Sequence, residues 1–124
     1  MQIDPVLALA IALAGGLGSV LRLALGRWQG RLPWGTLIAN LVAALVLGLS
    51  MALTDASLLA NWLGAVLFVG FAGGLSTFSG VAAETGEFIR SKNWAKAAAN
   101  LSGNLFLPVL MVWLPYAAVT LLVN

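Results

Sequence analysis

Apolar residues fill four long stretches of the chain, and short polar segments separate them. The stretches run from Pro5 to Gly26, Trp34 to Leu53, Asn61 to Ile89 and Ala97 to Val123. Each is long enough to cross a bilayer, which takes about 20 mostly apolar residues in a helix. Because lipid offers the backbone no hydrogen bonds, a spanning segment of this length is expected to be helical. The sequence therefore predicts an all-α integral membrane protein with four transmembrane helices, which form one domain over residues 1–124.

Composition narrows the possible functions. Hydrophobic residues make up 61% of the chain and charged residues 8%, too few to cover a water-soluble fold. The sequence has no Cys and no His, which removes thiolate and imidazole ligands and the commonest general base. The net charge of +2 is too small for a polyanionic partner, so no nucleic acid is expected. We expect a protein of the lipid bilayer that is not an enzyme.

The basic residues are confined to the first and third connections between the predicted helices. They are Arg22, Arg27, Arg31, Arg90, Lys92 and Lys96. In a four-helix chain these two connections face the same side of the membrane, and the positive-inside rule makes that side cytoplasmic. Both chain ends are therefore expected outside the cytoplasm. Arg22, near the end of its helix, can extend to the interface and help to set the orientation.

The third stretch is longer than one crossing requires, and the residues in its middle disfavour a continuous helix. Gly73 and Gly74 are adjacent there, and Ser76, Thr77 and Ser79 follow. One interpretation is close helix packing, since small residues are common at membrane helix contacts. The other is a helix broken near the bilayer midplane, whose freed backbone groups bind an ion or line a wet cavity. We favour the broken helix.

Four further polar side chains lie within the apolar stretches. Asn40 has two open interpretations: it bonds a neighbouring helix, or it presents its amide hydrogens to an anion. Glu84 lies one helical turn deeper than Glu87 and is a candidate for the rim of a vestibule. Asn100 and Asn104 are four residues apart and so share one face of the fourth helix.

Three motifs, in order along nearly the whole chain, resemble signatures of the Fluc (CrcB) fluoride channel family. Residues 15–22 read GGLGSVLR and resemble the family's glycine-rich first helix with its arginine. Trp34-Gly35-Thr36 followed by Asn40 resembles the WGTxxxN pattern of its second helix. Residues 70–79 read GFAGGLSTFS and resemble the GGLTTFS hallmark of its third helix.

This resemblance implies a four-helix subunit that pairs antiparallel with a second Fluc-type subunit, with two fluoride pores along the dimer. It also implies a central structural sodium ion, held by backbone carbonyls of Gly73 and Ser76. Asn40 would point its amide into a pore, and Phe78 would offer its ring edge, which carries partial positive charge. The implied function is passive fluoride efflux that relieves fluoride toxicity, and the implied location is the inner membrane of a prokaryote.

The resemblance extends to other side chains of the fluoride pore. Those implied are Thr77, Ser79, Glu84, Asn100 and Asn104, and Arg22 matches the family's first-helix arginine. Fluoride is small and strongly hydrated, so a pore has to replace its water with several weak donors in series. Amide and hydroxyl hydrogens and aromatic edges meet that need.

The chain departs from the family in three respects. Gly80 and Val81 stand where the family has Thr and a second Phe, and Asn100 stands where it has a tyrosine. The one-sided basic residues also disfavour a dimer of identical chains in opposite orientations. The second subunit is therefore either an identical chain or an oppositely oriented relative, and we favour the heterodimer as a hypothesis.

Two other functions compete with a channel. A small multidrug-resistance-type transporter also has four helices, but proton-coupled export needs a carboxylate deep in the first helix, and only Asp4 lies at its edge. A non-conducting membrane assembly subunit is compatible with the composition, but nothing in that role requires a broken third helix.

Overall fold

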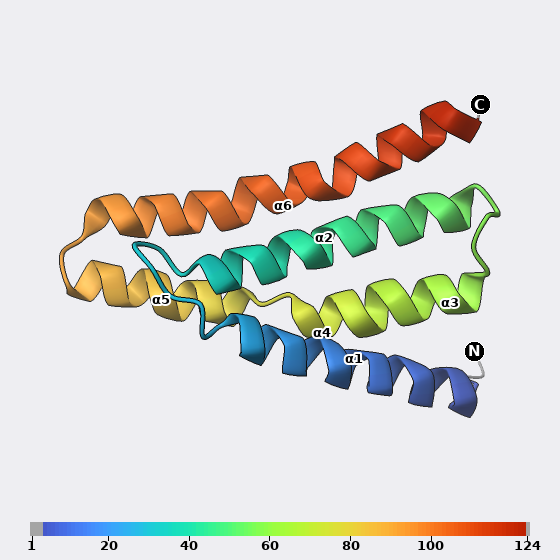
Figure 1. The fold of residues 1–124 in the computed structure, drawn as a ribbon, viewed down its shortest axis with the longest axis horizontal. Helices are drawn as coiled ribbons and strands as arrows, with labels where there is room; N and C mark the ends of the chain where they lie inside the picture. The colour runs from blue at the N-terminus through green and yellow to red at the C-terminus, as the bar shows by residue number, and fades with distance from the viewer. Residues whose placement is uncertain (1–3, 124) are drawn as a thin grey trace.

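The computed structural model describes residues 4–123, which form helices and contain no strand (Figure 1). In chain order the elements are α1 (Pro5–Leu25), α2 (Trp34–Asp55), α3 (Asn61–Ala65), the π-helical η1 (Val66–Ala72), α4 (Gly73–Leu75), α5 (Phe78–Arg90) and α6 (Trp94–Val123). Four spans are long and apolar enough to cross a membrane: α1, α2, α6 and the composite third span Asn61–Arg90. The prediction of an all-α protein with four spanning helices is confirmed.

Local capping accounts for where the helices begin. Asp4 precedes α1, its side chain accepts a hydrogen bond of 2.9 Å from the Val6 N–H, and Pro5 follows at the first helical position. The fourth helix begins at Trp94, three residues before the predicted start at Ala97. Its first turn forms because the Asn93 side chain accepts a hydrogen bond of 3.3 Å from the Lys96 N–H.

The four spans lie side by side, with the third span between α1 and α2, and α6 on the far side of α2 (Figure 1). Both ends of the described chain are at one end of the molecule, opposite the α5–α6 connection. The small buried core consists of Ala39, Ala43, Ala72 and Leu75. Small side chains let α2 and the third span approach closely, so these two elements form the centre of the subunit.

Backbone contacts fix α1 against the third span. A Cβ atom added to Gly18 would overlap the Phe71 carbonyl of η1, and one added to Gly74 would overlap the Gly15 carbonyl of α1. Glycine is therefore required at both positions for the two helices to touch. This contact includes the residues directly before the break in the third span, and so holds that break in place.

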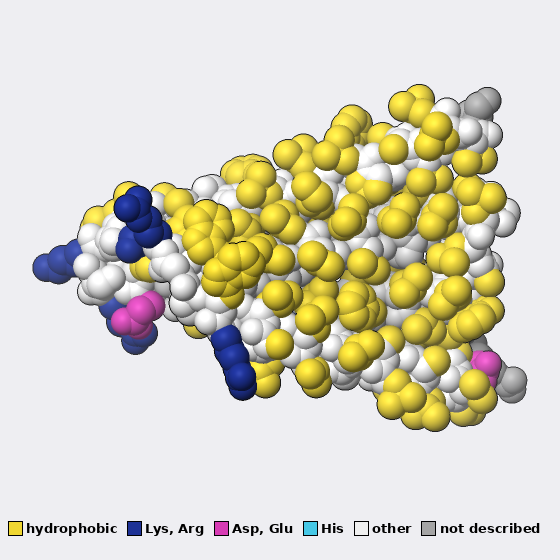
Figure 2. Space-filling model, viewed as in Figure 1, with side chains coloured by type: hydrophobic (Ala, Val, Ile, Leu, Met, Phe, Trp, Pro, Cys, Tyr) yellow, Lys and Arg dark blue, Asp and Glu magenta, His cyan; other side chains and the backbone are white. Residues whose placement is uncertain are grey.

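The surface agrees with a membrane environment. Figure 2 shows hydrophobic side chains over most of one face, while Lys and Arg side chains gather at the end that holds the α5–α6 connection. The exposed large hydrophobic residues include Leu13 and Leu17 of α1 and Phe106 and Trp113 of α6. Arg90 at the basic end forms an ion pair with Glu87, one turn earlier on α5. The positions of the basic residues match the charge pattern read from the sequence.

Candidate functional site

The third span is interrupted at its middle. Ser76 and Thr77 are extended, with φ and ψ of −72° and 151° and of −150° and 124°, between the end of α4 and the start of α5. The break predicted from the glycine pair and the hydroxyl residues is confirmed. The π-helical turns of η1 precede it, and no pattern in the sequence indicated them. Such turns are common at functional sites because they redirect backbone groups.

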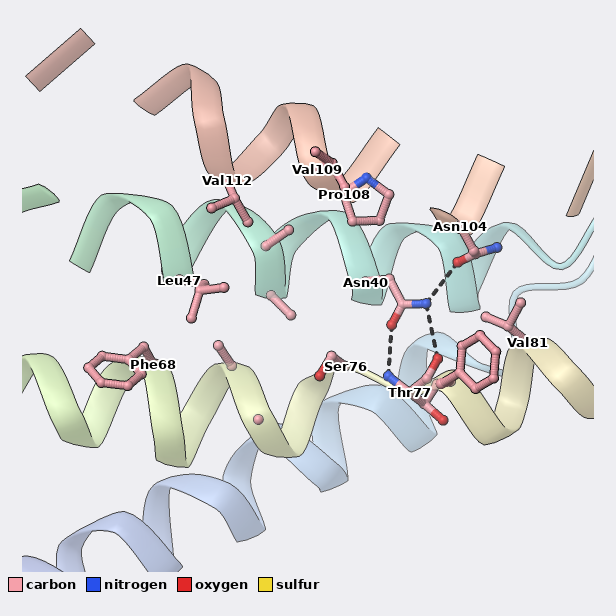
Figure 3. Close-up of a pocket in the computed structure, with 15 residues that line it drawn as sticks. Asn40, Leu47, Phe68, Ser76, Thr77, Val81, Asn104, Pro108, Val109 and Val112 are labelled. Atoms are coloured by element: carbon pink, nitrogen blue, oxygen red, sulfur yellow. Dashed lines mark hydrogen bonds between the residues drawn. The ribbon is translucent and has the colours of Figure 1, made fainter. Parts of the chain in front are cut away.

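Asn40 holds the break. Its Oδ1 accepts a hydrogen bond of 2.8 Å from the Thr77 N–H, and its Nδ2 donates one of 3.1 Å to the Thr77 carbonyl (Figure 3). In a continuous helix the Thr77 N–H would donate to the Gly73 carbonyl. The buried amide of α2 replaces that helical bond and satisfies both backbone groups of Thr77. Asn40 therefore bonds a neighbouring helix, the first of its two interpretations.

A chain of amide groups continues from Asn40 to α6 and back to α5. Asn40 Nδ2 also donates to Asn104 Oδ1 at 2.7 Å. Asn104 Nδ2 in turn donates to Asn100 Oδ1 at 3.2 Å and to the Asn100 carbonyl at 3.0 Å. The last link runs from Asn100 Nδ2 to Thr85 Oγ1 at 3.1 Å. These bonds tie α2, α6 and α5 together around the break.

Thr77 also begins α5. Its Oγ1 accepts a hydrogen bond of 3.0 Å from the Gly80 N–H, which is the usual role of a threonine before a helix. The same oxygen lies 3.2 Å from Ser79 Oγ. The family resemblance implied only a pore position for Thr77. Its capping role was missed, although a threonine directly before a helical stretch is a recognisable signal.

A cavity of about 400 Å³ opens beside the break (Figure 3). The polar and aromatic residues that line it are Asn40, Phe68, Gly73, Ser76, Thr77, Phe78 and Asn104. Its remaining walls are apolar and include Val81. The Phe78 side chain is 68% exposed, so its ring is available to whatever enters the cavity or covers it. We call this the break cavity.

A second cavity, of about 530 Å³, lies on the α1 side of the break. Arg22 and Arg27 line it together with the hydroxyl residues Ser19, Thr36, Thr77 and Ser79. Thr77 lines both cavities, so the break separates an amide-lined space from a basic one. Arg22, expected to act at the interface, thus also faces a cavity next to the break.

Glu84 and Asn100 line neither of the two cavities. Glu84 Oε1 accepts a hydrogen bond of 2.5 Å from Thr36 Oγ1, and its Oε2 is buried without a hydrogen-bond partner among the described residues. Asn100 is 3% exposed, and its side-chain amide is hydrogen-bonded to Thr85 and Asn104. The structure therefore brings Asn40, Thr77, Phe78 and Asn104 together but not the whole set predicted from the sequence.

Comparison with known proteins agrees with this architecture. A family model described as CrcB-like protein, Camphor Resistance (CrcB), matches residues 9–116. A protein of Thermus thermophilus named fluoride-specific ion channel FluC is 38% identical over 113 residues, 87% of this chain and 89% of its own length. Proteins with the same name from Opitutus terrae and Shewanella woodyi are 36% and 35% identical, over 90% and 86% of this chain and 91% and 90% of their own.

Proposed function

This chain belongs to the CrcB-like family, and from that premise we propose that it is a subunit of a fluoride-selective channel for passive fluoride efflux. The relatives named as fluoride-specific channels are similar over most of both chains. The observation that carries the proposal is the helix break at Ser76 and Thr77, which puts amide, hydroxyl and aromatic groups around one cavity inside the apolar spans. The chain is a channel subunit and not an enzyme. A proton-coupled transporter is disfavoured because α1 contains no Asp or Glu.

We assign the fluoride path to the break cavity. Asn40, Thr77 and Asn104 carry amide or hydroxyl hydrogens, and Phe78 exposes its ring. Such weak donors replace the hydration shell of a small anion while leaving it free to depart. The family roles of the remaining residues stay part of the proposal: Arg22 and Ser79 in the approach from the basic end, and Glu84 and Asn100 in the polar layer behind the path.

A structural sodium ion fits the backbone beside the path. Because the Thr77 N–H donates to Asn40, the Gly73 carbonyl is released from its helical partner, and Ser76 is extended. Both residues line the break cavity. Hard cations prefer oxygen ligands, and residues 4–123 contain no cluster of three His, Cys, Asp or Glu that could bind a metal instead. When bound, sodium would accept coordination from these two carbonyl oxygens, which otherwise lack helical hydrogen-bond partners at the break. Two carbonyls leave a cation undercoordinated, which supports a second subunit supplying more.

We therefore place this subunit in an antiparallel dimer within the inner membrane of a bacterium. The exposed Phe78 ring and the open break cavity support a partner surface there. The basic residues at one end favour a single orientation for this chain. The partner is then an oppositely oriented relative, and the homodimer is the alternative.

Fluoride efflux from liposomes that contain only this chain tests the function and the partner together. A fluoride electrode records the efflux, and a chloride electrode records the matched control. Rapid efflux of fluoride without chloride is expected of a homodimer. If the folded chain alone releases no fluoride, co-expression with an oppositely oriented relative is expected to restore it. Equal release of both anions would contradict a fluoride-selective channel.

A further inference from the structure

We propose that the side-chain oxygen of Asn104 occupies the anion position at Asn40 while the pore is empty, and that fluoride has to displace it. Asn104 is then a selectivity-determining residue and not only a lining group. The inference rests on the proposed fluoride channel and adds how the hydrogen bond between Asn40 and Asn104 opens. It is carried by the hydrogen bonds around the break (Figure 3).

One backbone group fixes the direction of the whole amide chain. The Thr77 N–H can only donate, so the Asn40 atom that faces it is the oxygen Oδ1. Asn40 Nδ2 therefore faces α6, and the Asn104 atom that meets it has to be an acceptor, Oδ1. Asn104 Nδ2 then faces Asn100. The end of Asn104 that points toward Asn40 is a carbonyl oxygen, which repels anions.

Asn40 has no spare hydrogen in this arrangement. Its Nδ2 carries two hydrogens, and the acceptors are the Thr77 carbonyl at 3.1 Å and Asn104 Oδ1 at 2.7 Å. An anion that binds Asn40 has to replace one of these acceptors. Replacing the Thr77 carbonyl would break the two-point pairing that satisfies the backbone at the break. The anion is therefore expected to displace Asn104 Oδ1, because Asn104 is a half-buried side chain that lines the cavity.

Displacement gives a physical basis for choosing among anions. A hydrogen bond to an ion is roughly twice as strong as one between neutral groups. Fluoride concentrates its charge on a small radius and replaces an amide oxygen more effectively than a larger halide does. When the Asn104 side chain moves away from Asn40, the freed Asn40 N–H donates to the ion, while Asn104 Nδ2 keeps an acceptor on Asn100. The oxygen that blocks the empty pore is thereby removed from the anion position.

Substitution of Asn104 distinguishes a residue that competes with fluoride for Asn40 from one that only lines the cavity. N104A removes the competing oxygen, so fluoride efflux at limiting concentration should rise about two- to tenfold, the range expected for one neutral hydrogen bond. The fluoride-to-chloride flux ratio should fall in the same variant. N104D keeps the shape but fixes a negative charge at the site, and should abolish efflux. S102A is the matched control, because the Ser102 hydroxyl bonds only carbonyls of its own helix.

The side-chain amide signals of the ¹⁵N-labelled protein provide a readout that does not depend on flux. Fluoride is expected to shift the NH₂ signals of both Asn40 and Asn104, and chloride to leave them in place. Absence of a shift at Asn104 would overturn the inference, even if N104A does not fold. If the wild type releases fluoride and N104A releases it at the same rate or more slowly, the inference is also wrong. The proposed channel function is not affected by that result. Equal release of fluoride and chloride by the wild type would instead refute the channel function on which the inference rests.

Discussion

The pairing of Asn40 with the break makes a quantitative prediction about stability. In Asn40→Ala, three hydrogen bonds disappear: the two to the backbone of Thr77, at 2.8 and 3.1 Å, and the one to Asn104, at 2.7 Å. The Thr77 N–H and Asn104 Oδ1 lose their partners, while the Thr77 carbonyl, which directly precedes α5, keeps the first hydrogen bond of that helix. A buried polar group left unpaired costs about 1–3 kcal/mol.

The expected loss follows from the two groups left unpaired, the Thr77 N–H and Asn104 Oδ1. Because both residues line the break cavity and are not enclosed on every side, the two penalties do not add in full. We expect the free energy of unfolding of Asn40→Ala to fall by about 2–5 kcal/mol. The matched control is Ser50→Ala on the same helix. Ser50 is also buried, but its hydroxyl bonds only the Leu47 carbonyl one turn earlier. A loss of about 1 kcal/mol or less is expected there.

Reversible unfolding in mixed detergent micelles measures both variants. The five tryptophans report the transition by fluorescence. Fluoride efflux from the conducting assembly, either this chain alone or this chain with its co-expressed partner, reports the site. Asn40→Ala should unfold at a lower denaturant fraction and lose fluoride efflux. If its stability lies within about 0.5 kcal/mol of Ser50→Ala, a difference typical of neutral surface changes, Asn40 does not hold the break and the reasoning is wrong.

Three further predictions follow from the same contacts. Phe78→Leu should lower fluoride efflux about two- to tenfold through loss of the ring edge. Phe106→Leu is the control and should leave efflux unchanged. Phe106 is 69% exposed, much like Phe78 at 68%, but it does not line the break cavity. Gly18→Val should cost about 3 kcal/mol or more through overlap with η1 and reduce the yield of folded protein. Gly16→Val, with open space around it, is the control. Replacing sodium with N-methylglucamine should lower the unfolding midpoint if the Gly73 and Ser76 carbonyls bind sodium; an unchanged midpoint would contradict that assignment.

The spans and the break could be predicted because both depend on local composition. Length and hydropathy define the four crossings, and the Gly73-Gly74 pair with its hydroxyl neighbours marks the weak point of the third. The boundaries shifted by a few residues where a single side chain caps a helix, as Asn93 does before Trp94. The π-helical η1 has no comparable signature, because its register is set by packing against α1.

The partners of the polar side chains could not be predicted, because they come from distant parts of the chain. Asn40 meets Thr77 and Asn104, 37 and 64 residues away. Helical periodicity showed that Asn100 and Asn104 share a face but not which helix covers it. The structure buries Asn100 against Thr85 and leaves Asn104 at the cavity. Glu84 likewise turns toward Thr36 of α2, a contact that no spacing along the chain indicates.

Ion selectivity tests the central claim most directly. The purified channel in a planar bilayer would face fluoride on one side and an equal concentration of chloride on the other. A fluoride-selective channel should give a reversal potential close to that of a membrane permeable to fluoride alone. A reversal potential near zero would show that fluoride and chloride pass equally, and would contradict the assignment of fluoride selectivity to this family member.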